Sequence, residues 1–320
     1  MRRIPGTVAS VRPVTDYGTI RRASLDDIPA AAGVRAAALP DIIVTAEGML
    51  RWHTGMRPDC DLLMLVAEVD GAVVGWGTGR RLWERDEPDG AMADVVVHPD
   101  HQGRGIGGRL ASRVRDHLEP LSLSSVRASS ADVPAATTLA RRHELIEIGS
   151  ERLSAVDPRT VEPLPVPDGT QVRPFRDLPD PRPVYELDLE VSRDIPGESG
   201  VNGWTLEDWT AQFWHTPTCD PDLSLVAYVD DELAAVTMLR FDAPSGRAMN
   251  ALTGTRSAYR GRGLARLLKT HSLHLAGRAG ATLAITSNED RNAAMLAVNE
   301  SLGYRPFSRR VEWEWQRGDA

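Results

Sequence analysis

The pattern of hydrophobic and polar residues predicts a series of strands and helices, and the same series occurs twice along the chain. Two apolar hairpins with acidic turn residues are predicted, over 62–69 and 72–78 and again over 223–229 and 233–239. Further strands are predicted over 19–23, 93–97 and 125–129 in the first half and over 170–175, 249–255, 282–287 and 311–315 in the second half. The order of elements therefore predicts two similar units.

Helices are predicted where apolar residues recur every three to four positions. In the first half these segments are 25–39, 45–52 and 135–142, and a long helix follows residue 105, with its apolar residues spaced by four from Ile106 to Leu118. In the second half they are 183–192, 206–214 and 293–302, with a long helix after residue 263. Each half is thus expected to be an α+β unit, in which helices flank a mostly antiparallel sheet.

A glycine-rich segment occurs once in each half. Residues 102–110 read QGRGIGGRL and residues 260–268 read RGRGLARLL, and Arg260 lies 158 positions after Gln102. The apolar strand that begins at Leu225 lies 160 positions after the strand that begins at Leu65. Two matches at nearly one spacing indicate a duplicated domain rather than a short-period repeat.

A proline-rich segment predicts the boundary between the two units. Residues 1–160 are expected to form the first domain, with 1–18 as a leader, and residues 169–320 the second. Residues 161–168, with prolines at 163, 165 and 167, are expected to be an extended linker. Because each half has about 150 residues, each is expected to fold as its own domain.

Composition excludes several classes of protein. The formal net charge of −8 argues against a general affinity for nucleic acid or acidic membranes. No apolar run approaches the roughly 18–20 residues of a membrane span, and no secretory signal follows Met1, so a cytoplasmic protein is expected. The two cysteines, Cys60 and Cys219, provide neither a disulfide framework nor a Cys-rich zinc site, and no metal is expected.

The glycine-rich segments carry the chemistry that the sequence predicts. In each, a strand ends, a tight turn follows and a helix begins, so unpaired N–H groups at the helix start meet a bare glycine backbone. This arrangement suits a pyrophosphate, and Arg104 and Arg262 offer further contacts to phosphate. Neither segment ends in the Gly-Lys-Ser/Thr of a Walker loop, and Arg266 interrupts the dinucleotide spacing in the second half.

The pattern Gln/Arg-x-x-Gly-x-Gly/Ala after a strand resembles the coenzyme A loop of the GNAT superfamily of acyl-CoA N-acyltransferases. The order of strands is also similar, over about 19–157 and 169–316, and the tandem arrangement resembles that of actinobacterial tandem GNAT proteins. The resemblance implies two tandem GNAT acetyltransferase folds and acetyl-CoA as cosubstrate. In the first half it implies coenzyme A contacts by Val95, Val97, Gln102, Gly103, Arg104, Gly105, Ile106 and Gly107. In the second half it implies contacts by Leu252, Thr253, Thr255, Arg260, Gly261, Arg262, Gly263, Leu264, Ala265, Asn288 and Asn292.

The usual acid and base of the family are missing from the matching positions. The general-base position holds Ala91 and Met249, and the general-acid position holds Ala140 and Asn299. Asp194 and Glu198, in a loop expected to wall the acceptor site of the second half, are the candidate bases, with Asn299 as a further candidate catalytic residue. Asp94 is the candidate of the first half, and a base acting through water is the alternative.

The resemblance implies an N-acetyltransferase that acts on a small-molecule amine as a monomer or homodimer, with its chemistry in the second half. The alternative is a coenzyme A-binding regulatory or scaffold protein without turnover. Trp204, Trp209 and Trp214 are expected in the core or in the wall of the acceptor pocket. Lys269, the single lysine, is expected to be an exposed side chain, with a contact to a coenzyme A phosphate as the alternative.

Overall fold

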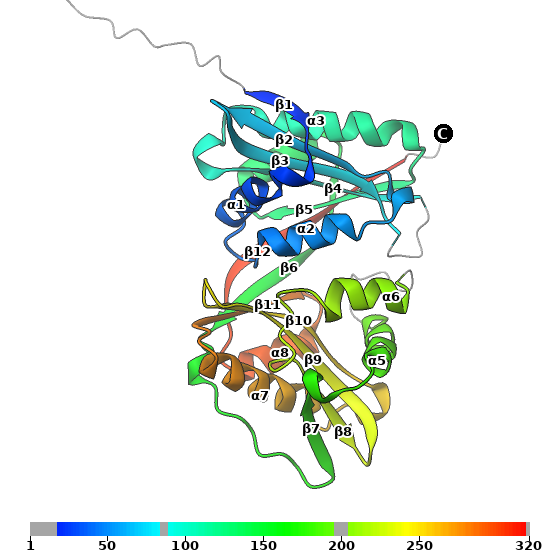
Figure 1. Cartoon of the computed structure of the whole chain (residues 1–320), viewed down its shortest axis with the longest axis vertical. Coiled ribbons are helices and arrows are strands. Elements are labelled where there is room, and N and C mark those ends of the chain that lie inside the picture. Colours follow the sequence, from blue (N-terminus) through cyan, green and yellow to red (C-terminus); the bar gives the residue numbers. More distant parts are fainter. Residues whose placement is uncertain (1–17, 84–88, 195–203, 318–320) are drawn as a thin grey trace, which may run out of the picture.

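The strands of the two halves join into one mixed sheet. The computed structural model describes residues 18–83, 89–194 and 204–317. Within them the order of strands is β1-β2-β3-β4-β5-β12-β6-β11-β10-β9-β8-β7. The α+β fold class, with helices on both faces of a mostly antiparallel sheet, is confirmed (Figure 1).

The elements have the following bounds. The strands of the first half are β1 (Thr19–Arg22), β2 (Leu63–Val69), β3 (Ala72–Arg81), β4 (Gly90–Val97), β5 (Ser125–Ala131) and β6 (Ile146–Val156). Its helices are α1 (Ile28–Ala38), α2 (Ala46–Thr54), α3 (Ile106–Leu118) and α4 (Pro134–Arg142). The strands of the second half are β7 (Thr170–Pro174), β8 (Leu225–Val229), β9 (Glu232–Asp242), β10 (Arg247–Thr255), β11 (Leu283–Glu289) and β12 (Arg305–Gln316). Its helices are α5 (Arg182–Ser192), α6 (Leu206–Trp209), α7 (Leu264–Arg278) and α8 (Ala293–Ser301).

Two elements differ from the sequence prediction. The helix predicted over 206–214 is a regular α-helix only to Trp209 and continues as a π-helical turn over Thr210–Trp214. Strand β6 was not predicted, because its residues do not alternate cleanly between apolar and polar. Both differences lie in segments where packing against the other half, rather than local pattern, determines the backbone.

The last strand of each half completes the sheet of the other half. Strand β12 pairs antiparallel with β5, from Arg310 opposite Ala131 to Gln316 opposite Ser125. Strand β6 pairs antiparallel with β11, from Ala284 opposite Val156 to Glu289 opposite Glu151. Strands β6 and β12 also pair with each other in the middle of the sheet. The sheet therefore runs across the predicted domain boundary, which itself stays a prediction.

Alternation along β9 separates the two faces of the sheet in the second half. Val236 and Met238 pack with α5 and Trp209 on one face. Ala235 packs with the start of α7, and Leu239 packs with its later turns, on the opposite face. The face that carries α5 and α6 is called the acceptor face below, and the face that carries α7 and α8 the coenzyme face.

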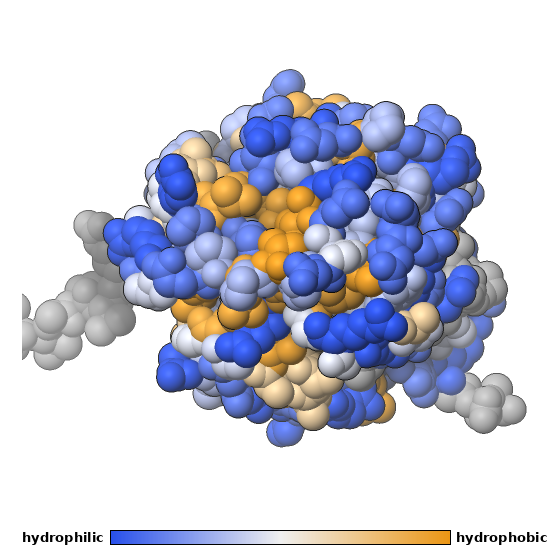
Figure 2. Space-filling view, turned by 90° about the horizontal axis from the view of Figure 1, so that it is seen from below, coloured by the Kyte–Doolittle hydropathy of each residue, from blue (hydrophilic) through white to orange (hydrophobic). Residues whose placement is uncertain are grey.

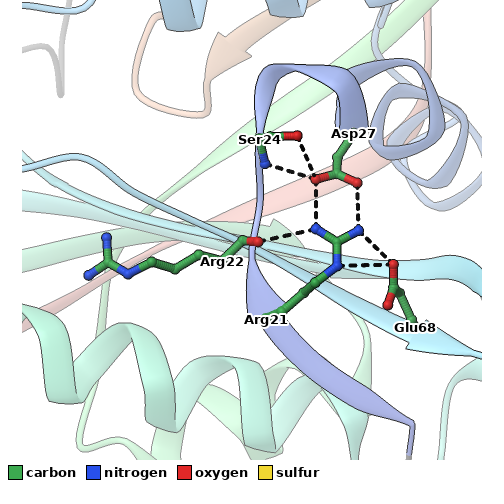
Figure 3. A network of polar contacts seen from close by, with 5 residues as sticks. All are labelled: Arg21, Arg22, Ser24, Asp27 and Glu68. Carbon is green, nitrogen blue, oxygen red and sulfur yellow. Dashed lines mark hydrogen bonds and ion pairs between the residues drawn. The ribbon is translucent and has the colours of Figure 1, made fainter.

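A network of charged groups fixes the first strand to the first helix (Figure 3). The guanidinium of Arg21 donates to both carboxylate oxygens of Asp27 at 2.8 Å and to Glu68 on β2 at 2.6 Å. The backbone N–H of Ser24 also donates to Asp27 at 2.8 Å. These hydrogen bonds, first that from Arg21, hold the pKa of the Asp27 carboxyl well below its usual range.

Candidate functional site

Two parallel strand pairs separate part-way along their length, one in each half. Strands β4 and β5 pair only from Gly90 opposite Ser125 to Met92 opposite Arg127. Strands β10 and β11 pair only from Arg247 opposite Leu283 to Asn250 opposite Thr286. Beyond these pairs the strands diverge, which leaves a V-shaped slot between β4 and β5 and a second one between β10 and β11.

The glycine-rich segments lie where these slots open. Gly103, Gly105, Gly261 and Gly263 all have a positive φ between 74° and 78°, a conformation that glycine adopts without strain. A Cβ at Gly103, Gly261 or Gly263 would meet no atom within 4 Å. The loop backbone is therefore bare, as the close approach of a ligand requires.

The starts of α3 and α7 offer free N–H donors. Neither helix has a side chain that caps its N-terminus, and each is preceded by a glycine in the left-handed conformation. The backbone hydrogen bonds of the loop end at Gln102 and Arg260, and resume within the helix at Arg109 and Leu267. The backbone N–H groups between these residues form no such bond and are available to bind an anion. The described residues therefore fit the pyrophosphate of coenzyme A.

The first residue of each motif holds the loop against its strand. Gln102 donates from Nε2 to the carbonyl of Val97 at 3.0 Å, and Arg260 donates from Nε to the carbonyl of Thr255 at 3.2 Å. Arg104 bonds the carbonyl of Asp100 at 2.9 Å, and the guanidinium of Arg262 lies 5.0 Å from the ring centroid of Tyr259. The two loops therefore have matching geometry.

A β-bulge distinguishes the slot of the second half. The register between β9 and β10 shifts between Asn250 and Leu252, which leaves Ala251 outside the ladder and exposed. The register between β3 and β4 runs without a shift from Gly75 opposite Val97 to Arg81 opposite Ala91. A bulge frees backbone groups from the ladder, so only β10 presents such a group at the point where the slot begins.

The side chain of Asn250 spans this bulge. Its Nδ2 donates to Oγ1 of Thr237 at 3.0 Å and to the carbonyls of Met238 and Leu252 at 3.3 and 3.4 Å. Its Oδ1 accepts from the hydroxyl of Thr253 at 2.8 Å. Asn250 therefore ties the residues on both sides of the bulge to β9.

Lys269 is buried beside this network, so the expectation of an exposed lysine is wrong. Its side chain is 1% exposed, and Nζ donates to Oδ1 of Asn250 at 3.1 Å. Nζ lies 5.1 Å from the ring centroid of Tyr304. Burial lowers the pKa of Lys269 to about 7. The sequence missed this because the side chains beside Lys269, those of Asn250 and Tyr304, lie far from it along the chain.

Buried polar atoms remain unpaired in the same slot. Asn299 donates from Nδ2 to Oδ1 of Asn288 at 2.6 Å, while its own Oδ1 has no partner among the described residues. The hydroxyl of Tyr304 is also buried without a partner in the described chain. Because an unpaired buried polar atom costs free energy, these atoms favour a ligand that supplies the missing hydrogen bonds.

Asn292 serves the helix that follows. Its side chain accepts from the backbone N–H of Met295 at 3.2 Å and thereby caps the N-terminus of α8. A direct contact to coenzyme A by Asn292 stays a prediction, as do the contacts predicted for the other loop and strand residues.

The slot of the first half contains a cavity. A cavity of about 700 Å³ lies there, lined by Ala93 and Val95 of β4, by the facing sides of α3 and α4, and by Trp313. Ala111, Ala140 and Leu145 line it at the positions that Lys269, Asn299 and Tyr304 occupy in the second half. At these three positions the first half therefore has apolar side chains, where the second half has side chains that form hydrogen bonds or carry polar atoms.

The predicted bases lie in different places. Asp194, just past the end of α5, pairs with the guanidinium of Arg260 at the loop of the second half. Asp94, on β4, pairs with Arg35 of α1. Glu198 falls outside the described residues. The structure thus brings Asp194 to the coenzyme loop, while its catalytic role stays a prediction.

Aromatic side chains join the two halves over the acceptor face. Trp204 lies 4.6 Å from Trp83 and 6.2 Å from Trp52 between ring centroids, so residues of the first half close over the second. Trp209 is buried and donates to Asp188, and Trp214 stacks on Phe175. The expectation that the three tryptophans lie in the core or near the acceptor pocket agrees with these positions.

An apolar hollow lies at one end of the second half. Figure 2 views the molecule from the end at which β7 and β8 lie in Figure 1, and apolar surface gathers there in a hollow with a polar rim. The last residue of β10, Thr255, lies opposite Ala235 near the start of β9, so the loop at 256–263 is at this same end. The coenzyme loop of the second half and this apolar surface therefore lie at the same end of the molecule.

Comparison with known proteins agrees with this geometry. The sequence model of the Acetyltransferase (GNAT) family matches residues 39–142 and 186–304. The chain therefore belongs to the GNAT family of acetyltransferases and carries two copies of its fold, which confirms the resemblance seen in the sequence.

Relatives match most of the length of the chain. The chain is 32% identical over 267 residues to the mycothiol acetyltransferase of Kineococcus radiotolerans, covering 78% of this chain and 79% of the relative. It is 28% identical over 251 residues to that of Rhodococcus erythropolis, covering 75% and 80%. A solved tandem GNAT protein from the clavulanic acid biosynthesis pathway has a TM-score of 0.73 at 21% identity, covering 94% of this chain and 99% of that one. The chain is thus an N-acetyltransferase of the GNAT superfamily.

Two features are absent from residues 18–83, 89–194 and 204–317. None of their helices combines the length and the apolar character needed to cross a membrane. They also contain no cluster of three or more His, Cys, Asp or Glu side chains placed to hold a metal ion.

Proposed function

We propose that the chain transfers an acetyl group from acetyl-CoA to the amino group of a small molecule, and that the second half carries out the reaction. The bulge at Ala251 is the observation that carries this proposal, because it lies where the β10–β11 slot begins and has no counterpart in β4. The names of the relatives, mycothiol acetyltransferases, support a small-molecule acceptor.

Different residues of the second half bind different parts of acetyl-CoA. The N–H groups at the start of α7 bind the pyrophosphate, and the free edge of β10 beyond Leu252 pairs with the amides of the pantetheine arm. This places the thioester at the bulge. A backbone N–H freed there stabilises the oxyanion that forms when the amine attacks the carbonyl carbon.

The leaving thiolate and the amine proton need separate partners. Asn299 and Tyr304 lie in the slot with unpaired polar atoms, and a Tyr304 hydroxyl is a donor at any pH below its raised pKa. Met249 at the usual base position takes no proton, so the amine reacts in its neutral form or loses its proton to water or to a loop carboxylate. Asp194 and Glu198 remain the candidate carboxylates.

A thiol-release assay tests this proposal. Purified protein with acetyl-CoA is expected to release free thiol when an accepted amine is present, and calorimetry is expected to show saturable binding of acetyl-CoA. Absence of binding would contradict the coenzyme site itself.

The alternative, a coenzyme A-binding regulator without turnover, rests on the replacement of the usual base by Ala91 and Met249. Saturable binding of acetyl-CoA without thiol release across a broad panel of amines would favour it.

A further inference from the structure

Arg240 is a half-buried arginine whose guanidinium has no hydrogen-bond partner among the described residues. It lies near the end of β9, and its Nε is buried without a hydrogen bond. Burial lowers its pKa, and Cys219 is the one described group whose charge opposes that effect. Buried arginines are normally paired with a carboxylate, because an unpaired buried charge is costly. This residue therefore favours a bound anion, because no described residue provides one.

The side chain lies on the acceptor face of the second half. Val236 and Met238 pack on that face with α5, and alternation along the strand places Arg240 there as well. In the sheet Arg240 is directly opposite Met249, which occupies the usual position of the family's base. The guanidinium thus extends from the position next to where the acceptor amine reacts.

The distance to the reacting carbon suits a small acceptor. Met249 is two residues before Ala251 at the bulge, about 7 Å along the strand. Directly opposite residues in a sheet have Cβ atoms about 5 Å apart. An arginine side chain spans much of the remaining gap, so one small molecule can contact the guanidinium and place its amine at the bulge.

The matched residue of the first half is partnered. Arg80 lies 160 positions before Arg240, at the same point of the other hairpin. Its Nη1 donates to the carbonyl of Arg81 at 3.1 Å, and its guanidinium lies 5.9 Å from the ring centroid of Trp52. An arginine at this position of the strand can therefore find a partner, and the lack of one is specific to Arg240 in the second half.

We infer that Arg240 binds a carboxylate of the acceptor, so that the substrate of this site is an amino-acid-like amine that carries its carboxylate a few bonds from the amino group. This inference rests on the proposed acetyl transfer in the second half. A neutral analogue would leave the half-buried guanidinium without a charged partner. A site built to hydrogen-bond one group of its substrate discriminates strongly against an analogue that lacks that group.

Amino acids and their amides provide the test. The twenty protein amino acids and their carboxamides are compared for thiol release, and for binding by calorimetry to protein saturated with coenzyme A. Each pair has the same shape and differs in the charge of one group. The best amino acid is expected to exceed its amide by about 100-fold or more in kcat/KM and in affinity.

Two variants assign the effect to Arg240. Arg240→Gln is expected to remove most of the preference for the acid, mainly through a higher KM, while affinity for acetyl-CoA is unchanged. Arg240→Lys keeps the charge and is expected to retain part of the preference, which covers the case in which Arg240→Gln does not fold. Arg278→Gln, at an exposed position at the end of α7, is the control and is expected to behave as the wild type.

The outcomes separate the two proposals. Equal binding and turnover of acids and amides by the wild type, or an unchanged preference in Arg240→Gln, would overturn the carboxylate site and leave acetyl transfer intact. Binding of an amino acid without thiol release would instead retain the carboxylate site and contradict the proposed transfer.

Discussion

Lys269 carries a property that its sequence context does not indicate. The residue follows two leucines on a helix with a clear apolar face, where a lysine is normally exposed. It is buried beside the ring of Tyr304, which follows 35 residues later in the chain. Likewise, the sequence does not show that Arg240 lacks a hydrogen-bond partner among the described residues, because this depends on how the chain packs in three dimensions.

Burial of Lys269 predicts a pH dependence of stability. Its pKa is about 7 in the folded protein and 10.5 without burial, so between these values the unfolded chain binds more protons than the folded one. The free energy of unfolding therefore increases with pH across this window. Lys269→Met is expected to be more stable than the wild type near neutral pH, and the difference is expected to shrink as the pH approaches 10.5.

Urea unfolding from about pH 6 to about pH 10 measures this difference. Because the chain has a single lysine, no other lysine titrates in the window. Parallel stability curves for the two proteins would show that Lys269 does not have a lowered pKa.

At the scale of elements, the sequence predicted more of the coenzyme loop than of the strand before it. Glycines at fixed spacing between a strand and a helix mark the loop, since few other residues adopt its backbone conformation. The bulge of β10 carries no such mark, because Ala251 and its neighbours suit a regular strand. The register shift depends on the hydrogen bonds of Asn250 to β9, which the sequence alone does not show.

Asn250 is therefore expected to position the bulge for catalysis. Asn250→Ala removes the bonds that span the bulge and is expected to lower kcat by about 10- to 100-fold, which is less than the roughly 100- to 1,000-fold cost of losing an oxyanion donor outright. The KM for acetyl-CoA is expected to change little, because the loop and the start of α7 are untouched. Met92→Ala, in the first half at the matching distance before its loop, is the control. A rise in KM with unchanged kcat would contradict this role.

At the scale of the whole molecule, duplication was visible in the sequence and the exchange of strands was not. A repeat shows that two similar units exist, but β6 and β12 suit either half equally well by local pattern. The placement of β12 beside β5 depends on contacts between residues far apart in the chain, such as the ion pair of Arg127 with Glu314 at 2.9 Å. The expectation that each half folds by itself stays a prediction, and the shared strands argue against it.

Separate expression of the halves tests this dependence. Fragments 1–160 and 169–320 are each expected to be poorly soluble alone, because β5 and β11 then lack their partner strands. Co-expression is expected to give a soluble complex that purifies together. A monomeric first fragment with native circular dichroism would show that β6 can take the place of β12 beside β5.

The central claim, that acetyl transfer takes place in the second half, is tested most directly by blocking each coenzyme loop in turn. Gly263→Trp places a bulky side chain over the N–H groups of α7, and Gly105→Trp does the same at α3. Gly280→Trp, also at a positive φ and in open space, controls for backbone strain. We predict that Gly263→Trp abolishes thiol release with an accepted amine, while Gly105→Trp and Gly280→Trp retain most of it. Loss of activity in Gly105→Trp with activity preserved in Gly263→Trp would place the reaction in the first half and contradict the account.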